Sequence, residues 1–119
     1  MKNILVAGLL ATLGTAAFAD GQAEIASVLV NSVSAIGSPL GLHVAGNFEV
    51  TFTTPVSHGL ACDATYYTTK RVNDPDRLLF GMLLDAKQRN VPIGLRISDQ
   101  ASLTAYPGRC SIVAIAMTK

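Results

Sequence analysis

The most regular hydrophobic pattern in this chain predicts a helix over residues 75–90. Apolar residues recur there at the i, i+3, i+4, i+7 spacing of one helix face: Leu79, Met82, Leu83 and Ala86. Asp74 can accept hydrogen bonds from first-turn amides as N-cap, and Pro75 suits the first helical position because it lacks an N–H. Asn90 suits the left-handed residue after a helix. We expect Leu83 to be buried and Lys87 to be exposed.

Five other segments show strand patterns, in which apolar and polar residues alternate or β-branched residues dominate. They are 24–33, 47–54, 61–70, 93–98 and 110–117. Segments rich in Gly, Pro or polar residues separate them, at 36–41, 55–59 and 99–108. The last strand, CSIVAIAM, is apolar on both faces, so we expect its second face to meet the helix or a neighbouring subunit.

The predicted element order is β-β-β-α-β-β, which makes the chain mainly β with one helix. This is the order of the OB-fold, a five-stranded Greek-key barrel with its helix between the third and fourth strands. The alternative is an open α+β sheet with the helix packed on one face. The order does not distinguish them, because closure of a barrel depends on twist and register.

Residues 1–19 have the pattern of a secretory signal peptide. Lys2 is followed by an apolar stretch over residues 4–13, and Ala17-Phe18-Ala19 forms an A-x-A cleavage site. The apolar stretch is too short to span about 30 Å of hydrocarbon. We therefore expect a single domain over residues 20–119, secreted or periplasmic, with no membrane insertion after the signal is removed.

The charge balance argues against two classes of partner. The chain has nine Lys and Arg and eight Asp and Glu, and loss of Lys2 with the signal leaves eight of each. Proteins that bind nucleic acid present strongly basic surfaces, and electrostatic membrane binding also needs clustered cations. A nearly neutral domain therefore predicts neither nucleic acid nor a membrane surface as partner.

The two cysteines, Cys62 and Cys110, allow only one intramolecular pairing. In an oxidising compartment we expect them to form a disulfide, which would restrict the unfolded chain by roughly 4 kcal/mol in the entropy model. The other interpretation is a reactive thiol pair. The C-x-x-C spacing of redox motifs is absent, which favours a structural role.

A resemblance to a known family follows from these features. The chain combines the predicted strand order, a cysteine that opens the third strand (Cys62), the helix LLFGMLLDAK and a second cysteine near the fifth strand (Cys110). In this it resembles the small OB-fold B subunits of bacterial AB5-type toxins, of the subtilase-cytotoxin and pertussis-like group. The resemblance implies a non-enzymatic, pentameric binding subunit with a glycan as ligand.

No pattern of residues predicts catalysis. A zinc site needs about four ligands, and His43 and His58 are not part of any metal-binding spacing, so we interpret both as surface histidines. Asp74 and Asp76 are better explained as helix-capping carboxylates than as a catalytic pair. No G-x-S-x-G or similar motif supports a nucleophile. We therefore expect a protein that is not an enzyme and needs no cofactor.

The best recognition candidate is the end of the third predicted strand. Tyr67, Thr69 and Arg71 alternate there, so they are expected on one side, where they would form a surface patch. The alternative is that one of the two adjacent tyrosines fills the core. Tyr106 is a further candidate because it lies in the loop between strands four and five, which OB-folds use for ligands.

Three functional hypotheses remain. The first is a secreted binding module for a glycan or a protein, which could be a homo-oligomer. The second is a periplasmic structural or inhibitor-like protein that acts through a protein interface. A small hydrolase ranks last, because no catalytic constellation supports it.

Overall fold

The computed structural model describes residues 21–117, so the predicted signal peptide lies outside the described residues. The described chain is mainly β with one helix. The strands are β1 (Gln22–Val28), β2 (Val30–Ala35), β3 (Phe48–Phe52), β4 (Asp63–Thr69), β5 (Ile93–Ser98) and β6 (Arg109–Met117). A 3-10 turn (Arg71–Asn73) and the helix α1 (Leu78–Arg89) lie between β4 and β5.

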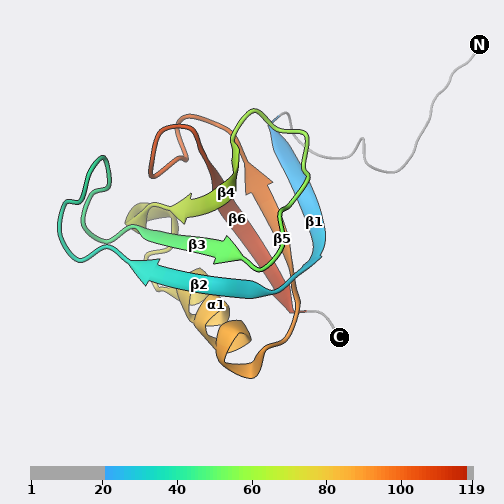
Figure 1. The fold of residues 1–119 in the computed structure, drawn as a ribbon. Helices are drawn as coiled ribbons and strands as arrows, with labels where there is room; N and C mark the ends of the chain where they lie inside the picture. Colours follow the sequence, from blue (N-terminus) through green and yellow to red (C-terminus); the bar gives the residue numbers. More distant parts are fainter. Residues whose placement is uncertain (1–20, 118–119) are drawn as a thin grey trace, which may run out of the picture.

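The described strands form one mixed sheet in the order β1-β5-β6-β4-β3-β2 (Figure 1). Only the central pair, β4 and β6, is parallel, and the other neighbours are antiparallel. The two outermost strands, β1 and β2, are consecutive in the chain and are separated only by Leu29. The two ends of the sheet are therefore brought together at this residue.

The prediction of five strands is wrong, because segment 24–33 forms two strands and not one. The pairing of β1 with β5 shifts in register between Ile25 and Val28, and that of β2 with β3 shifts between Val30 and Ser32. Irregularities of this kind bend a strand and increase its twist. The sequence there contains no Gly or Pro, so the change of direction has no turn signal.

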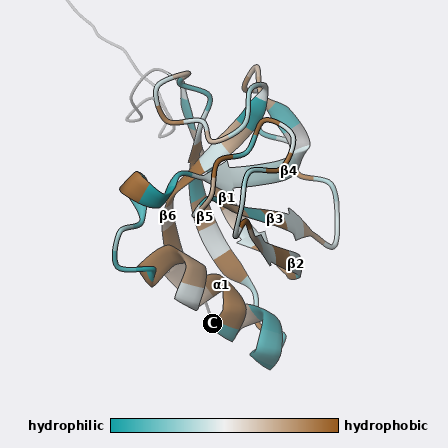
Figure 2. Cartoon of the chain, turned by 90° about the vertical axis from the view of Figure 1, so that its left-hand side faces the viewer, coloured by the Kyte–Doolittle hydropathy of each residue, from teal (hydrophilic) through white to brown (hydrophobic). Residues whose placement is uncertain are grey.

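The core lies between the curved sheet and the helix. Among its fully buried side chains are Phe48, Val50, Tyr67, Leu83 and Ile97. The helix α1 packs against β2 and β6, and Figure 2 shows it beneath the strands with its last turn hydrophilic. Leu83 is buried and Lys87 is exposed, as the apolar periodicity predicts.

The helix begins at Leu78, three residues later than predicted, because Asp74 is not its N-cap. A turn over Pro75 and Asp76 intervenes, and Arg77 occupies the N-cap position with a left-handed φ of 60°. Asp74 nevertheless caps the helix with its side chain. Its Oδ1 accepts from the Leu79 amide at 3.0 Å, and its Oδ2 accepts from the Phe80 amide at 3.0 Å.

The disulfide between Cys62 and Cys110 is confirmed. Cys62 directly precedes β4 and Cys110 is the second residue of β6, so the bond joins the two parallel strands at the centre of the sheet. The Asp63 amide also donates to the Gly108 carbonyl at 2.8 Å. Covalent and hydrogen bonds thus hold the same end of this pair together.

Replacing the capping carboxylate tests the start of the helix. In Asp74→Ala two first-turn amides lose their acceptor, so we expect the free energy of unfolding to fall by about 2 kcal/mol, the upper end of the range for helix caps. Asp76→Ala is the matched control, because this neighbouring carboxylate is exposed. Urea unfolding followed by circular dichroism measures both changes. Equal losses would contradict the assigned role of Asp74.

Candidate functional site

An arginine stacked on two tyrosines forms the most distinctive cluster on the surface of the described residues. Arg109 is the first residue of β6, and its Cζ lies 3.9 Å from the ring centroid of Tyr106 and 4.5 Å from that of Tyr66. Tyr106 comes from the loop between β5 and β6, whereas Tyr66 lies on β4. Guanidinium groups are attracted to aromatic faces at these distances. We call Arg109, Tyr66, Tyr106, Glu49 and His43 the aromatic–arginine cluster.

Glu49 on β3 holds the guanidinium in this orientation. Arg109 Nη1 donates to Glu49 Oε2, and His43 Nε2 lies 3.3 Å from the same oxygen. The side chains of Arg109 and Glu49 are about four-fifths buried, with 22% and 18% of their surface exposed. Partial burial reduces solvent screening of the ion pair, so the arginine is presented as a positioned and largely neutralised group.

His43 is buried in this cluster, so its interpretation as a surface histidine is wrong. Its ring centroid lies 4.7 Å from that of Tyr106. The cause is the shape of the loop over residues 36–47. Leu40 and His43 exchange two backbone hydrogen bonds around Gly41, whose φ of 58° suits a tight turn, and this hairpin turns His43 inward against Tyr106.

The same hairpin leaves three aliphatic side chains in solvent. Leu40, Leu42 and Val44 are 64%, 63% and 61% exposed. They lie at this turn or directly beside it, and in the sequence they flank the inward-facing His43. The 36–47 loop therefore offers an apolar surface next to the aromatic–arginine cluster.

The patch expected from Tyr67, Thr69 and Arg71 does not form on the surface. Tyr67 and Thr69 are buried, because β4 lies between β3 and β6 and these residues face the core. The Tyr67 ring lies 5.1 Å from that of Phe52, and Thr69 Oγ1 donates to the Ile112 carbonyl at 3.2 Å. The alternative, that one adjacent tyrosine fills the core, is what the structure shows.

The remaining two candidates have different surroundings. Arg71 is exposed in the 3-10 turn, where its side chain lies against Gly46. Tyr106 lies in the aromatic–arginine cluster, together with Tyr66, which is 39% exposed and points away from the core. Neither Glu49 nor Tyr66 was a candidate from the sequence, because no sequence signal brought either of them beside Arg109.

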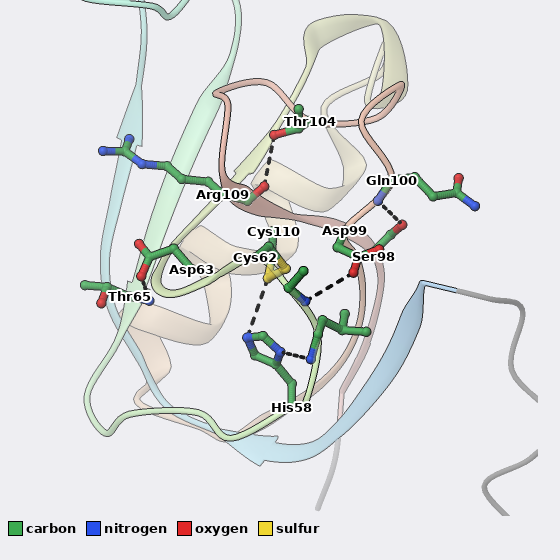
Figure 3. Close-up of a disulfide and its surroundings, with 12 residues drawn as sticks. His58, Cys62, Asp63, Thr65, Ser98, Asp99, Gln100, Thr104, Arg109 and Cys110 are labelled. Atoms are coloured by element: carbon green, nitrogen blue, oxygen red, sulfur yellow. Dashed lines mark hydrogen bonds between the residues drawn. A yellow bond between two sulfur atoms is a disulfide. The ribbon is translucent and has the colours of Figure 1, made fainter.

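A second cluster surrounds the disulfide (Figure 3). His58 Nε2 lies 3.6 Å from Cys110 Sγ, and His58 Nδ1 accepts a hydrogen bond from the Leu60 amide at 3.0 Å. His58 is half-buried, so it is not a plain surface histidine either. The ligand atoms of His58, Cys62 and Cys110 lie within 4.8 Å of one another. Thiolates are the metal-binding form of cysteine, and in this structure both sulfurs are joined in the disulfide.

Comparison with protein-family models, with curated proteins and with solved structures found no match for this chain. Within residues 21–117, no helix has the length and apolar character needed to cross a membrane. The interpretation of the site therefore rests on its own geometry.

The core tyrosine on β4 makes stability depend on pH. Burial, and secondarily the negative charge of Asp63, raises the pKa of Tyr67 from 10.0 to about 12. Between these values the unfolded chain loses the Tyr67 proton while the folded chain retains it. The unfolded state then binds fewer protons, so stability falls as the pH rises.

We therefore expect the free energy of unfolding to decrease between pH 10 and about 12, by up to ~1.4 kcal/mol per pH unit. Tyr67→Phe should have a flatter profile across this window, because it lacks the titrating group. Tyr66→Phe is the control and should retain the wild-type slope, because Tyr67 is still present. Urea unfolding at a series of alkaline pH values gives the three profiles. Identical slopes would show that Tyr67 does not contribute.

Proposed function

We propose that this chain is an exported, non-catalytic binding module with an OB-like fold, and that the aromatic–arginine cluster is its ligand surface. The strand arrangement supports the fold. If β1 and β2 are counted as one bent strand, the sheet has five strands, with the helix between the third and the fourth. Both sheet edges then belong to the first strand, as a curled Greek-key barrel requires.

The location of the cluster is the observation that carries the proposal. OB-folds bind ligands on the face of strands two and three and with the loops that join strands one to two and four to five. In this count Glu49 lies on strand two and Tyr66 on strand three. His43 comes from the first of those loops and Tyr106 from the second. The cluster thus gathers side chains from all four of these elements.

The chemistry of the cluster suits a glycan. Tyr66 offers an exposed aromatic body, and the Arg109–Glu49 pair offers planar donors and acceptors in fixed positions. Binding sites of this type combine apolar surface with a few positioned polar groups. Oligosaccharides are among the ligands of OB-folds. A glycan is also what the resemblance to B subunits of AB5-type toxins implies.

The disulfide supports export. Disulfides persist in the periplasm and outside the cell and are rare in reducing compartments, and the described cysteines are paired. A secreted or periplasmic location agrees with the signal peptide predicted over residues 1–19. Glycans on the surfaces of cells would be accessible to a secreted protein.

A glycan array with residues 20–119 tests this proposal. We expect the protein to bind at least one glycan, and Tyr66→Ala to weaken that binding about tenfold through loss of the exposed ring. Arg109→Lys keeps the charge but loses the planar group that stacks and pairs, so it should weaken binding as well. Leu78→Ala, at an exposed position on α1, is the control and should bind as the wild type does.

The possible results separate the parts of the proposal. A wild-type protein that binds no glycan would contradict the ligand class. Glycan binding that is unchanged in both Tyr66→Ala and Arg109→Lys would contradict the assigned surface.

The exposed aliphatic side chains of the 36–47 loop favour a second candidate function, a protein interface. Leu40, Leu42 and Val44 lie together on a hairpin whose base is tied by the hydrogen bond from the Ile36 amide to the Asn47 carbonyl at 2.9 Å. Exposed apolar patches commonly mark interaction sites. A second copy of the chain is the partner that the toxin-subunit resemblance implies, and a periplasmic partner protein is the alternative.

Light scattering measures the self-association of the chain. We expect the wild-type mass to exceed that of a monomer, and Leu42→Asp to return it to the monomer, because a charge cannot be buried unpaired in an apolar interface. Leu78→Asp is the matched control, since this leucine on α1 is similarly exposed, at 69%. A monomeric wild type would contradict self-association through this loop.

A further inference from the structure

The disulfide has an asymmetric environment. Cys110 is fully buried, whereas Cys62 is half-buried at the start of the strand pair. His58 forms a hydrogen bond with only one of the two sulfurs: its Nε2 lies 3.6 Å from Cys110 Sγ. The residues that precede Cys62 fold back over the bond and place this histidine beside it (Figure 3). An external reagent therefore meets Cys62 first, while His58 contacts the sulfur behind it.

The hydrogen bonds of His58 assign its tautomer. The Leu60 amide donates to Nδ1 at 3.0 Å, so Nδ1 is an acceptor and carries no proton. In the neutral imidazole the proton must then be on Nε2. Nε2 is consequently the donor in its contact with Cys110 Sγ. This tautomer disfavours a metal site, because a metal-bound Nε2 requires the proton on Nδ1.

An N–H donor beside a buried sulfur matters most when the disulfide opens. Burial in apolar surroundings raises the pKa of a thiol, whereas a nearby donor or cation favours the thiolate. Tyr67 lies against the same histidine, with ring centroids 6.4 Å apart, and it brings no charge at neutral pH. His58 is therefore the group positioned to stabilise a thiolate on Cys110, and a better-stabilised thiolate is a better leaving group in exchange.

We infer that Cys62 is a site of thiol–disulfide exchange, open to low-molecular-weight thiols, with His58 as the residue that stabilises the departing Cys110 thiolate. The external thiolate attacks Cys62 Sγ and forms a new S–S bond. The Cys62–Cys110 bond breaks, and its electron pair remains on Cys110 Sγ, which accepts the hydrogen bond from His58 Nε2. A second external thiolate attacks the mixed disulfide, releases Cys62 as a thiolate and leaves as the oxidised dimer of the reagent.

This inference does not depend on the glycan or protein ligand. It concerns the end of the β4–β6 pair on the side of Tyr67, whereas the aromatic–arginine cluster lies on the side of Tyr66. A failure of either proposal leaves the other standing.

Reduction by glutathione at neutral pH tests the role of His58. In His58→Phe the ring volume is retained but the donor is lost, so we expect reduction to be about tenfold slower. The reduction potential should fall by about 30 mV if the equilibrium constant changes by the same factor. Ser57→Ala, at the exposed residue directly before His58, is the control and should leave the rate unchanged. A purely structural role for His58 predicts the opposite sign, since loosening the loop would expose the bond and speed its reduction.

Mapping the adduct in the wild-type protein tests the site without any variant. Reduction is quenched early with a maleimide, and the peptides are identified by mass spectrometry. We expect glutathione on Cys62 and the maleimide on Cys110. Glutathione on Cys110, or a rate in folded His58→Phe equal to or above that of the wild type, would overturn the proposal.

Discussion

The parallel pairing of β4 with β6 is the constraint on which the rest of the structure depends. In the described residues it is the only ladder that joins β1, β5 and β6 to β4, β3 and β2. Its pairing is short and irregular. Asp63 pairs with Arg109, the register then shifts, and Tyr67 pairs with Cys110 and Thr68 with Ser111. The disulfide and the hydrogen bond from Thr69 Oγ1 to the Ile112 carbonyl reinforce it. A covalent bond thus reinforces an irregular pairing at the centre of the sheet.

The same pairing produces both clusters because successive residues of a strand face opposite ways. Tyr67 and Cys110 face inward, where they meet His58 and the core. Tyr66 and Arg109, each one residue earlier, face outward and meet across the two strands. Shifting β6 by one residue along β4 would turn Cys110 outward and Arg109 inward. The proposed ligand surface and the exchange-reactive sulfur are therefore two sides of one register.

Periodicity within a segment proved a good guide to the fold, and contacts between segments were much harder to foresee. The apolar repeat around Leu83 located the helix, but its start was misplaced, since Arg77 adopts a left-handed conformation that its residue type does not signal. The division of segment 24–33 was missed because bulged pairing leaves no mark in a β-branched sequence. The disulfide was predictable because two cysteines permit one pairing.

For the site, Tyr106 could be proposed from its loop, whereas its contact with Arg109 could not. That contact requires the parallel register, the fold of the 99–108 loop and the hairpin that buries His43, all of which are long-range outcomes. The choice between Tyr66 and Tyr67 depended on which face of β4 meets the core. Alternation establishes that the two tyrosines lie on opposite faces of β4, but only packing decides which of them is exposed.

The single-residue link at Leu29 bears on how the length of this chain can change in evolution. Strand alternation has a period of two, so one residue inserted there would turn the buried Val30 toward solvent while leaving β1 in place. The 36–47 loop tolerates length change differently, because residues added at its tip lie beyond the hydrogen bond between Ile36 and Asn47. Insertions and deletions should therefore accumulate in this loop, where they would diversify the proposed interface, and be purged at Leu29, where they would dismantle the sheet.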